Sequence, residues 1–311
     1  MKRVSIVIPV YQNQNDLADS IASLLALRDA LSNFELELVF VDDGSTDDSY
    51  KILTDIQRSD TGLITLVKLT KNFGQGQAIR EGVRVATGDC IGIISADLQD
   101  PPELFQDMIF HWEAGTKLVI GERVGRDDGP VHRFFSRCYW KLVSRFAIEG
   151  FPEGGFDFCL FDKKIKTILD SIDEQNTAIF PLLFWLGFDF EIIKYDRRKR
   201  LKGKSQWTLK KRIQLTIDTL IGFTYLPVRI ISVSGLVVSL IALGYALFLF
   251  VRWWAVGSTV EGWTSLSILV LAIGGLTLIS LGVIAEYLWR ILEETRRRPS
   301  AVIEEIKLNS K

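Results

Sequence analysis

The chain has 311 residues, of which 48% are apolar and 24% are charged, and its formal net charge is −1. These values are ordinary for a folded protein and exclude an intrinsically disordered chain, and the length allows one large domain or two smaller ones. Three cysteines, Cys90, Cys138 and Cys159, are too few and too scattered for a disulfide framework, and no pair has metal-ligand spacing. We interpret them as reduced thiols on the cytosolic side.

Short apolar runs alternate with helical patterns over the first 121 residues. The runs predict five strands, at residues 4–10, 36–41, 63–69, 90–94 and 117–121. Helices are predicted between them, over 16–31, up to Val85, and from Pro101 onward. Strands that alternate with helices in this way indicate an α/β fold with a Rossmann-like, mostly parallel sheet covered on both faces.

Polar loops follow three of these strands. Asp42-Asp43-Gly44-Ser45 follows the second strand, and the octet from Ser95 to Pro102 follows the fourth. Parallel strands place such loops at one edge of the sheet, where carboxylate and amide oxygens suit Mg²⁺ or Mn²⁺ on a diphosphate. One alternative is that Asp97 or Asp100 only caps the next helix. Residues 71–76, after the third strand, fit a structural turn better than a phosphate loop.

Residues 156–161 are predicted to form an aromatic strand, and one acidic residue, Asp157, lies inside it between Phe156 and Phe158. A carboxylate in such surroundings is costly unless it is paired or used, so Asp157 is a candidate base or orienting group. The alternative is a structural ion pair with one of the arginines nearby. Residues 188–195 are predicted to form the last strand.

The carboxy-terminal third contains two long apolar segments. Residues 228–251 are 24 residues with one charge, Arg229, and residues 265–285 are 21 residues with none. A helix needs about 20 apolar residues to cross a hydrocarbon core of about 30 Å, so we predict two transmembrane helices. The alternative, two buried core helices, would leave very large apolar faces to cover.

Basic residues flank the two segments unequally. The connection between the segments holds only Arg252, whereas those outside are Lys210, Lys211, Arg212, Arg290, Arg296, Arg297 and Arg298. Because positive charge favours the cytoplasmic side, we expect an integral protein of the bacterial inner-membrane type, with its amino-terminal domain and both termini in the cytoplasm. Small residues in the segments, such as Gly235 and Gly274, are compatible with a homo-oligomer.

A basic window precedes the first apolar segment. Residues 194–212 contain ten Lys or Arg against the single acid Asp196, which indicates an anionic partner. Membrane lipid headgroups and one specific phosphate both fit, whereas two membrane segments and the acidic loops argue against nucleic acid. We therefore divide the chain into a cytoplasmic domain (1–208), an interfacial amphipathic helix (209–225), a transmembrane hairpin (226–290) and a cytoplasmic tail (291–311).

Four motifs, taken in their order along the chain, resemble those of one known enzyme family. The sequence is similar to the family 2 glycosyltransferases of GT-A fold, and more narrowly to the polyprenyl-phosphate glycosyltransferases of the GtrB and dolichol-phosphate mannose synthase type. The resemblance covers essentially the whole chain. Its motifs are Val7-Ile8-Pro9-Val10-Tyr11, Val41-Asp42-Asp43-Gly44-Ser45-Thr46-Asp47, Lys71-Asn72-Phe73-Gly74 and Ala96-Asp97-Leu98-Gln99-Asp100-Pro101-Pro102-Glu103.

The resemblance implies a role for individual residues. Asp97 and Gln99 would hold Mg²⁺ or Mn²⁺ on the donor diphosphate, Arg123 would lie near the phosphates, and Arg200 would face the lipid phosphate. The nucleoside would be surrounded by Pro9, Tyr11, Asp42 and Asp43. Further candidate binding residues are Arg126, Arg133 and Lys204.

The reaction that the resemblance implies is inverting transfer of one sugar from a nucleotide-sugar, best glucose from UDP-glucose, to a polyprenyl phosphate. Two residues depart from the family pattern, since many relatives carry Asp in place of Ser95 and Lys in place of Gln206. The first departure removes a carboxylate from the metal site. A processive polysaccharide synthase and a non-catalytic membrane scaffold that kept the fold are the competing interpretations.

Overall fold

The computed structural model describes residues 1–59, 62–97, 99–124, 151–152, 156–172, 174, 178–196, 226–256 and 262–308. The chain divides into two units, Met1–Thr216 together with Pro299–Lys311, and Ile217–Arg298, and each is described by itself. The predicted interfacial helix at 209–225 and most of the basic window lie outside the described residues.

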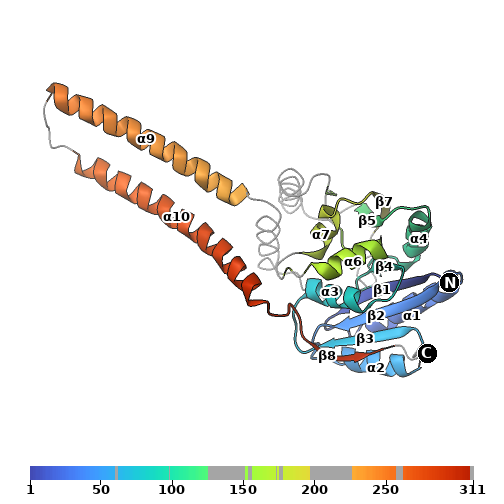
Figure 1. Cartoon of the computed structure of the whole chain (residues 1–311). Coiled ribbons are helices and arrows are strands. Elements are labelled where there is room, and N and C mark those ends of the chain that lie inside the picture. Colours follow the sequence, from blue (N-terminus) through green and yellow to red (C-terminus); the bar gives the residue numbers. More distant parts are fainter. Residues whose placement is uncertain are drawn as a thin grey trace. The chain divides into compact units, whose positions relative to one another are not determined.

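The first unit is built on one sheet, whose strand order is β7-β5-β6-β4-β1-β2-β3-β8 in the described chain (Figure 1). Strands β4, β1, β2 and β3 run parallel, and so do β5 and β7, whereas β6 runs antiparallel to β4 and β5. The predicted α/β class and the five predicted strands are confirmed. The strands are β1 (Arg3–Val10), β2 (Glu35–Asp42), β3 (Ile64–Leu69), β4 (Cys90–Ile93), β5 (Leu118–Val124), β6 (Cys159–Asp162), β7 (Phe190–Asp196) and β8 (Ile303–Lys307).

Helices cover both faces of this sheet because its strands are apolar on both sides. On β1, Ile6 and Ile8 belong to the same apolar core as Leu17 and Phe105, whereas Val7 on the opposite face meets α3 at Gly82. The helices are α1 (Leu17–Ala30), α2 (Ser49–Ser59), α3 (Gln75–Val85), η1 (Pro102–Leu104), α4 (Phe105–Glu113), α6 (Lys163–Ser171) and α7 (Ile179–Trp185).

The sheet has one strand that the sequence did not predict. Residues 188–195 form β7 as expected, but β7 is not the last strand, because β8 pairs antiparallel with β3 at the sheet edge (Figure 1). Its contacts come from the first half of the chain. Tyr50 donates a hydrogen bond to Glu305 (2.5 Å), and Gln57 donates one to the Lys307 carbonyl (2.8 Å).

The second unit contains two long helices, α9 (Leu226–Val256) and α10 (Trp263–Arg296). Both predicted apolar segments, 228–251 and 265–285, lie inside them. Each helix is long and apolar enough to cross a membrane, and none of the most apolar stretch of either helix is buried within the described structure.

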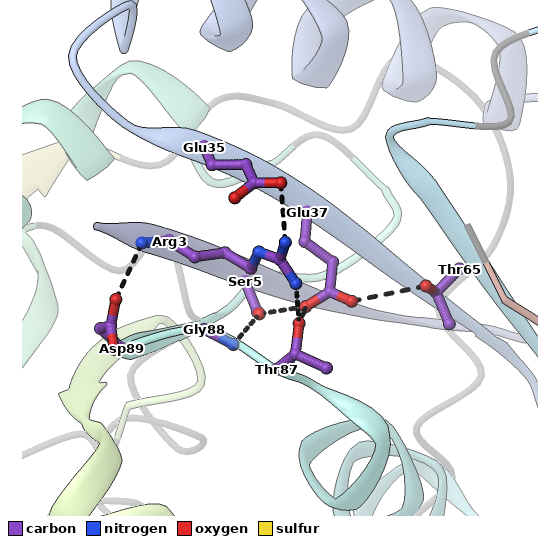
Figure 2. Close-up of polar contacts among 8 residues, drawn as sticks. All are labelled: Arg3, Ser5, Glu35, Glu37, Thr65, Thr87, Gly88 and Asp89. Atoms are coloured by element: carbon purple, nitrogen blue, oxygen red, sulfur yellow. Dashed lines mark hydrogen bonds and ion pairs between the residues drawn. The ribbon is translucent and has the colours of Figure 1, made fainter. Parts of the chain in front are cut away.

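Polar side chains join the amino ends of the central strands (Figure 2). Arg3 of β1 donates hydrogen bonds to Glu35 (2.7 Å) and Thr87 (2.8 Å), and its backbone N–H donates to Asp89 (2.9 Å). These bonds fix the turn before β4 to the start of β1 and β2. They stabilise the amino ends of the strands, at the end of the sheet opposite the polar loops.

Glu37 is the centre of this network and is only 2% exposed. Its carboxylate accepts hydrogen bonds from the Ser5 hydroxyl, from the Thr87 N–H and hydroxyl (both 2.9 Å), and from the Thr65 hydroxyl (3.4 Å) (Figure 2). Gly88 follows in the turn, and a Cβ there would lie 2.7 Å from the Ser5 nitrogen. The buried carboxylate is therefore fully used inside the protein.

Candidate active site

Hydrogen bonds tie the loop after β1 to the loop after β2. The Gln12 N–H donates to the Ser45 hydroxyl (3.1 Å), and the Asn13 N–H donates to the Ser49 hydroxyl (2.9 Å). Asn13 also accepts a bond from the Tyr11 N–H (3.0 Å), and Tyr11 itself is half-buried. The two loops thus form one ordered surface at the carboxyl ends of β1 and β2.

Asp42 ends β2 beneath that surface and is 0% exposed. One carboxylate oxygen, Oδ2, accepts a hydrogen bond from the Ser45 N–H (3.2 Å). The other, Oδ1, is buried and has no hydrogen-bond partner among the described residues. Burial raises the pKa of Asp42, although the bonds from Ser45 oppose the shift. A buried acceptor of this kind suits a ligand that brings an N–H donor.

Asp43 has a different role, because it holds the loop after β3. Its two oxygens accept hydrogen bonds from the N–H groups of Phe73 (2.7 Å) and Gly74 (2.9 Å). Gly44 lets that loop approach, since its φ is +66° and a Cβ there would lie 2.4 Å from the Lys71 carbonyl carbon. The amides of residues 73 and 74 therefore bind Asp43, which supports the structural-turn interpretation over a phosphate loop.

Asp97 lies in the loop after β4, and helix α1 holds this loop in place. The buried Ser20 hydroxyl donates to the Ala96 carbonyl (2.5 Å), and Asp97 accepts a bond from the Gln99 N–H (3.3 Å). Neither η1 nor α4 has a side-chain cap. Their N-cap residues are Pro101 and Leu104, so neither Asp97 nor Asp100 stands at the N-cap of the next helix.

Arg123 and Asp157 come together at the carboxyl end of β5. The Arg123 guanidinium forms an ion pair with Asp157, its Nε lies 3.7 Å from Asp100 Oδ1, and its Nε also donates to the Tyr195 hydroxyl (3.4 Å). Tyr195 in turn donates to Asp100 (2.6 Å). The ion pair that was the alternative explanation of Asp157 is thus present, and it is formed with a predicted site residue.

Two groups of this cluster, Arg123 and Tyr195, have shifted pKa values. Burial alone would lower the pKa of Arg123, but the carboxylates of Asp157 and Asp100 raise it above its usual range. Burial and the negative charge of Asp100 raise the pKa of Tyr195. A cationic guanidinium and a protonated hydroxyl therefore face two carboxylates.

The residues expected to bind a metal ion suit Mg²⁺ or Mn²⁺, since Asp97 and Gln99 supply hard oxygen donors two residues apart on one loop. The described part of the chain contains no group of three or more His, Cys, Asp or Glu able to hold a metal. Such a site is complete only when substrate phosphates add ligands, which is common for Mg²⁺.

The described site residues fall into three groups along the sheet, and Asp97 and Gln99 form the middle one, in the loop after β4. Pro9, Tyr11, Asp42 and Asp43 lie at the ends of β1 and β2, whereas Arg123 and Asp157 lie beyond β4, at β5 and β6. Four predicted residues lie outside the described chain: Arg126, Arg133, Arg200 and Lys204. The structure adds Asp100 and Tyr195. Asp100 stands in a recognised motif, but only the fold could show that Tyr195 reaches it.

Comparisons with known proteins identify the class to which this fold and site belong. The chain is 31% identical over 306 residues to a prophage bactoprenol glucosyl transferase homolog of Escherichia coli, covering 98% of this chain and 99% of the relative. It is 33% identical over 304 residues to an uncharacterized glycosyltransferase of Synechocystis, covering 97% and 95%. A bactoprenol glucosyl transferase of Shigella phage SfV is 29% identical over 306 residues, covering 98% and 99%.

The fold has a solved counterpart. A crystal structure of glucosyl-3-phosphoglycerate synthase from Mycobacterium tuberculosis, in complex with Mn²⁺, UDP and glucosyl-3-phosphoglycerate, matches with a TM-score of 0.51. The match covers 72% of this chain and 80% of that chain at 19% identity, so it concerns the fold alone. The expected GT-A fold is confirmed.

The protein is thus a glycosyltransferase. More particularly, the chain belongs to the family described as Glycosyl transferase family 2, whose model matches residues 5–180.

Proposed function

We propose that the protein transfers one glucose unit from UDP-glucose to a polyprenyl phosphate at the cytoplasmic face of a membrane, with inversion at the anomeric carbon. One observation carries this proposal. Relatives named as bactoprenol glucosyl transferases align with 97–99% of their own length, so the similarity includes both the glycosyltransferase domain and the two apolar helices.

The site supports the donor half of the reaction. Asp42 offers a buried acceptor for an N–H of the nucleobase, next to Tyr11 and Pro9 at the ends of β1 and β2. Asp97 and Gln99 would hold Mg²⁺ or Mn²⁺ against the diphosphate. When bound, such a metal ion stabilises negative charge on the leaving diphosphate.

The transfer step needs few protein groups. A phosphate oxygen of the acceptor attacks the anomeric carbon, and the carbon–oxygen bond to the diphosphate breaks, with its electron pair leaving on the nucleoside diphosphate. Because the second pKa of a phosphomonoester is about 6, the attacking phosphate is mostly ionised at neutral pH and needs no strong base. Arg123 offsets charge on the phosphates, and the ion pair supports an orienting role for Asp157.

The acceptor half of the proposal depends on residues beyond the described chain. Arg200 and Lys204 are proposed to bind the lipid phosphate, with Arg126 and Arg133 near the donor phosphates. Helices α9 and α10 are proposed to cross the membrane, with the connection between them outside and both termini in the cytoplasm.

The test is transfer from a panel of nucleotide-sugars to a short polyprenyl phosphate, using membranes that contain the full chain. We expect one sugar on a lipid that extracts into organic solvent, with UDP-glucose the best donor. Asp97→Ala is expected to lower the rate about 1,000-fold, since it removes the only carboxylate proposed to hold the metal ion. Asp107→Ala, which changes an exposed acid on α4, is the matched control.

Three results would contradict the proposal. A long polymer would identify a processive synthase, and no transfer by the wild type with any donor would favour a scaffold. Metal-dependent transfer that is unchanged in Asp97→Ala would refute the metal site.

A further inference from the structure

Asp100 is a fully buried carboxylate whose purpose the proposed reaction does not explain. It is 0% exposed and ends the loop that carries Asp97 and Gln99. Its Oδ1 accepts the Tyr195 hydroxyl at 2.6 Å and lies 3.7 Å from Arg123 Nε. Burying a carboxylate is costly, and the Tyr195 hydroxyl and the Arg123 guanidinium beside Oδ1 offset part of that cost.

Tyr195 is fixed from several directions. It lies on β7 directly opposite Arg123 in the β5–β7 register, and it is only 6% exposed. Its ring packs edge-to-face against Phe158, the residue before β6, with 5.7 Å between the ring centroids. The ring can therefore move little, and its hydroxyl stays between the guanidinium of Arg123 and the carboxylate of Asp100.

These contacts connect two parts of the site that come from different strands. Asp100 belongs to the loop after β4, and Arg123 belongs to β5, which is separated from β4 by β6 in the sheet. The Tyr195 hydroxyl joins them by one short bond to Asp100 and a longer one from Arg123. A long, flexible arginine is thereby held in one orientation, with Asp157 as its second anion.

We propose that Asp100 and Tyr195 are positioning residues, which hold the Arg123 guanidinium and the Asp97–Gln99 metal-binding loop in one fixed arrangement around the donor diphosphate. This inference rests on the proposed function. Neither residue needs to touch substrate. Each acts by keeping the cation and the metal-binding oxygens at the spacing that the departing diphosphate requires, where a small misplacement costs much of the rate.

The first test is Tyr195→Phe in the full chain, in detergent, which removes the hydroxyl and keeps the ring against Phe158. We expect kcat to fall about tenfold, and the Kd of Mn²⁺ in the presence of UDP, measured by titration calorimetry without acceptor, to rise about tenfold, because the loop that holds the metal loses a support. The KM for the nucleotide-sugar should stay within about twofold, because the nucleoside contacts at β1 and β2 are untouched.

Tyr50→Phe is a matched control for the loss of a hydroxyl. It removes a Tyr–carboxylate bond of similar length, to Glu305 of β8, and strands β4, β1 and β2 separate the β3–β8 pair from the Arg123 cluster in the strand order. Its kcat and metal dependence should equal those of the wild type. A general loss of stability would lower the activity of both variants, whereas loss of positioning lowers only that of Tyr195→Phe.

Asp100→Asn is the second variant, and it separates charge from hydrogen bonding. The amide oxygen can still accept the Tyr195 hydroxyl, but the negative charge beside Arg123 is gone. We expect kcat to fall at least tenfold. If this variant fails to fold, Tyr195→Phe decides the question alone.

The outcomes distinguish the inference from the function on which it rests. If the wild type transfers sugar and Tyr195→Phe matches it in kcat and metal dependence, the positioning role is refuted. The same holds if Tyr195→Phe and Tyr50→Phe lose activity equally. If the wild type transfers no sugar from any donor, the proposed function fails first.

Discussion

Strand β2 has a buried carboxylate near each end, and the two differ in their hydrogen bonds. Glu37 is 2% exposed near the start of the strand, and Asp42 is 0% exposed at its close. Glu37 accepts four hydrogen bonds from Ser5, Thr65 and Thr87 (Figure 2). Asp42 Oδ1, by contrast, is buried with no hydrogen-bond partner among the described residues.

This difference separates architecture from function. A buried acceptor whose donors all come from the protein stabilises the fold, whereas one left unmatched lowers stability until a ligand supplies the donor. Proteins break the rule of satisfied polar groups mainly at functional sites. Mutations at the amino ends of the parallel strands are therefore expected to change stability, whereas mutations at their carboxyl ends are expected to change activity.

The largest effect on the fold is expected from Glu37→Ala. The change leaves buried donors on Ser5 and Thr87 without an acceptor, each costing about 1–3 kcal/mol, so we expect the free energy of unfolding to fall by about 4 kcal/mol. Activity per folded molecule should stay within about twofold of the wild type. Urea unfolding of the full chain in detergent, followed by tryptophan fluorescence, measures the loss.

Glu35→Ala is the matched control on the same strand. Glu35 pairs with Arg3 at 2.7 Å, but its side chain is 41% exposed, so its loss should cost less than about 1 kcal/mol. Equal losses for the two variants would show that the buried network adds nothing beyond an ordinary surface ion pair.

At the carboxyl edge, Asp42→Asn is expected to separate stability from function. The amide keeps an oxygen for the Ser45 N–H but loses the acceptor proposed for the nucleobase, so UDP should bind about 30-fold more weakly. Stability without ligand should rise by about 1 kcal/mol, as is common when a strained functional site is relieved. Calorimetric titration with UDP and thermal unfolding test the two halves.

The pH dependence of the stability gained by Asp42→Asn follows from the direction in which burial shifts the pKa of Asp42. Burial raises the pKa of Asp42, so the folded state binds this proton more tightly than the unfolded state does. The charged carboxylate therefore destabilises the wild type above the folded pKa. The advantage of Asp42→Asn should be full at neutral pH and should shrink as the pH falls through that pKa toward the unfolded value. An advantage that grows on acidification would contradict the assignment.

Local sequence signals were enough to predict the central part of the fold. The apolar runs of β1 to β5 are short and β-branched, and helix α3 ends at the predicted Val85. Asp42 is the last residue of β2, and Asp97 lies in the loop after β4, so their position at the same ends of parallel strands followed from the pairing.

What the sequence did not predict depends on distant partners. Strand β8 reads Ile-Glu-Glu-Ile-Lys, and this short, charged segment forms a strand because β3, Tyr50 and Gln57 supply its partners. Tyr195 lies in the basic window, whose local sequence indicates only positive charge. Its hydrogen-bond partner Asp100 is 95 positions away in the chain, so the sequence could not show the contact. Glu37 did carry a local signal, an acid inside an apolar strand, which is the signal that marked Asp157.

The smallest expected effect tests whether the hydrogen bonds to Glu37 contribute equally to stability. The Thr65 hydroxyl lies 3.4 Å from Glu37, the longest of the four contacts, whereas the two from Thr87 are 2.9 Å. Thr65→Val keeps the shape of the side chain and removes that hydroxyl, and Glu37 keeps its other donors, so we expect a loss of about 0.5 kcal/mol. Thr87→Val also loses the bond from Arg3 and should cost about 1–2 kcal/mol. If Thr65→Val were the more destabilising of the two in urea unfolding, the network would be centred on β3 rather than on the turn before β4.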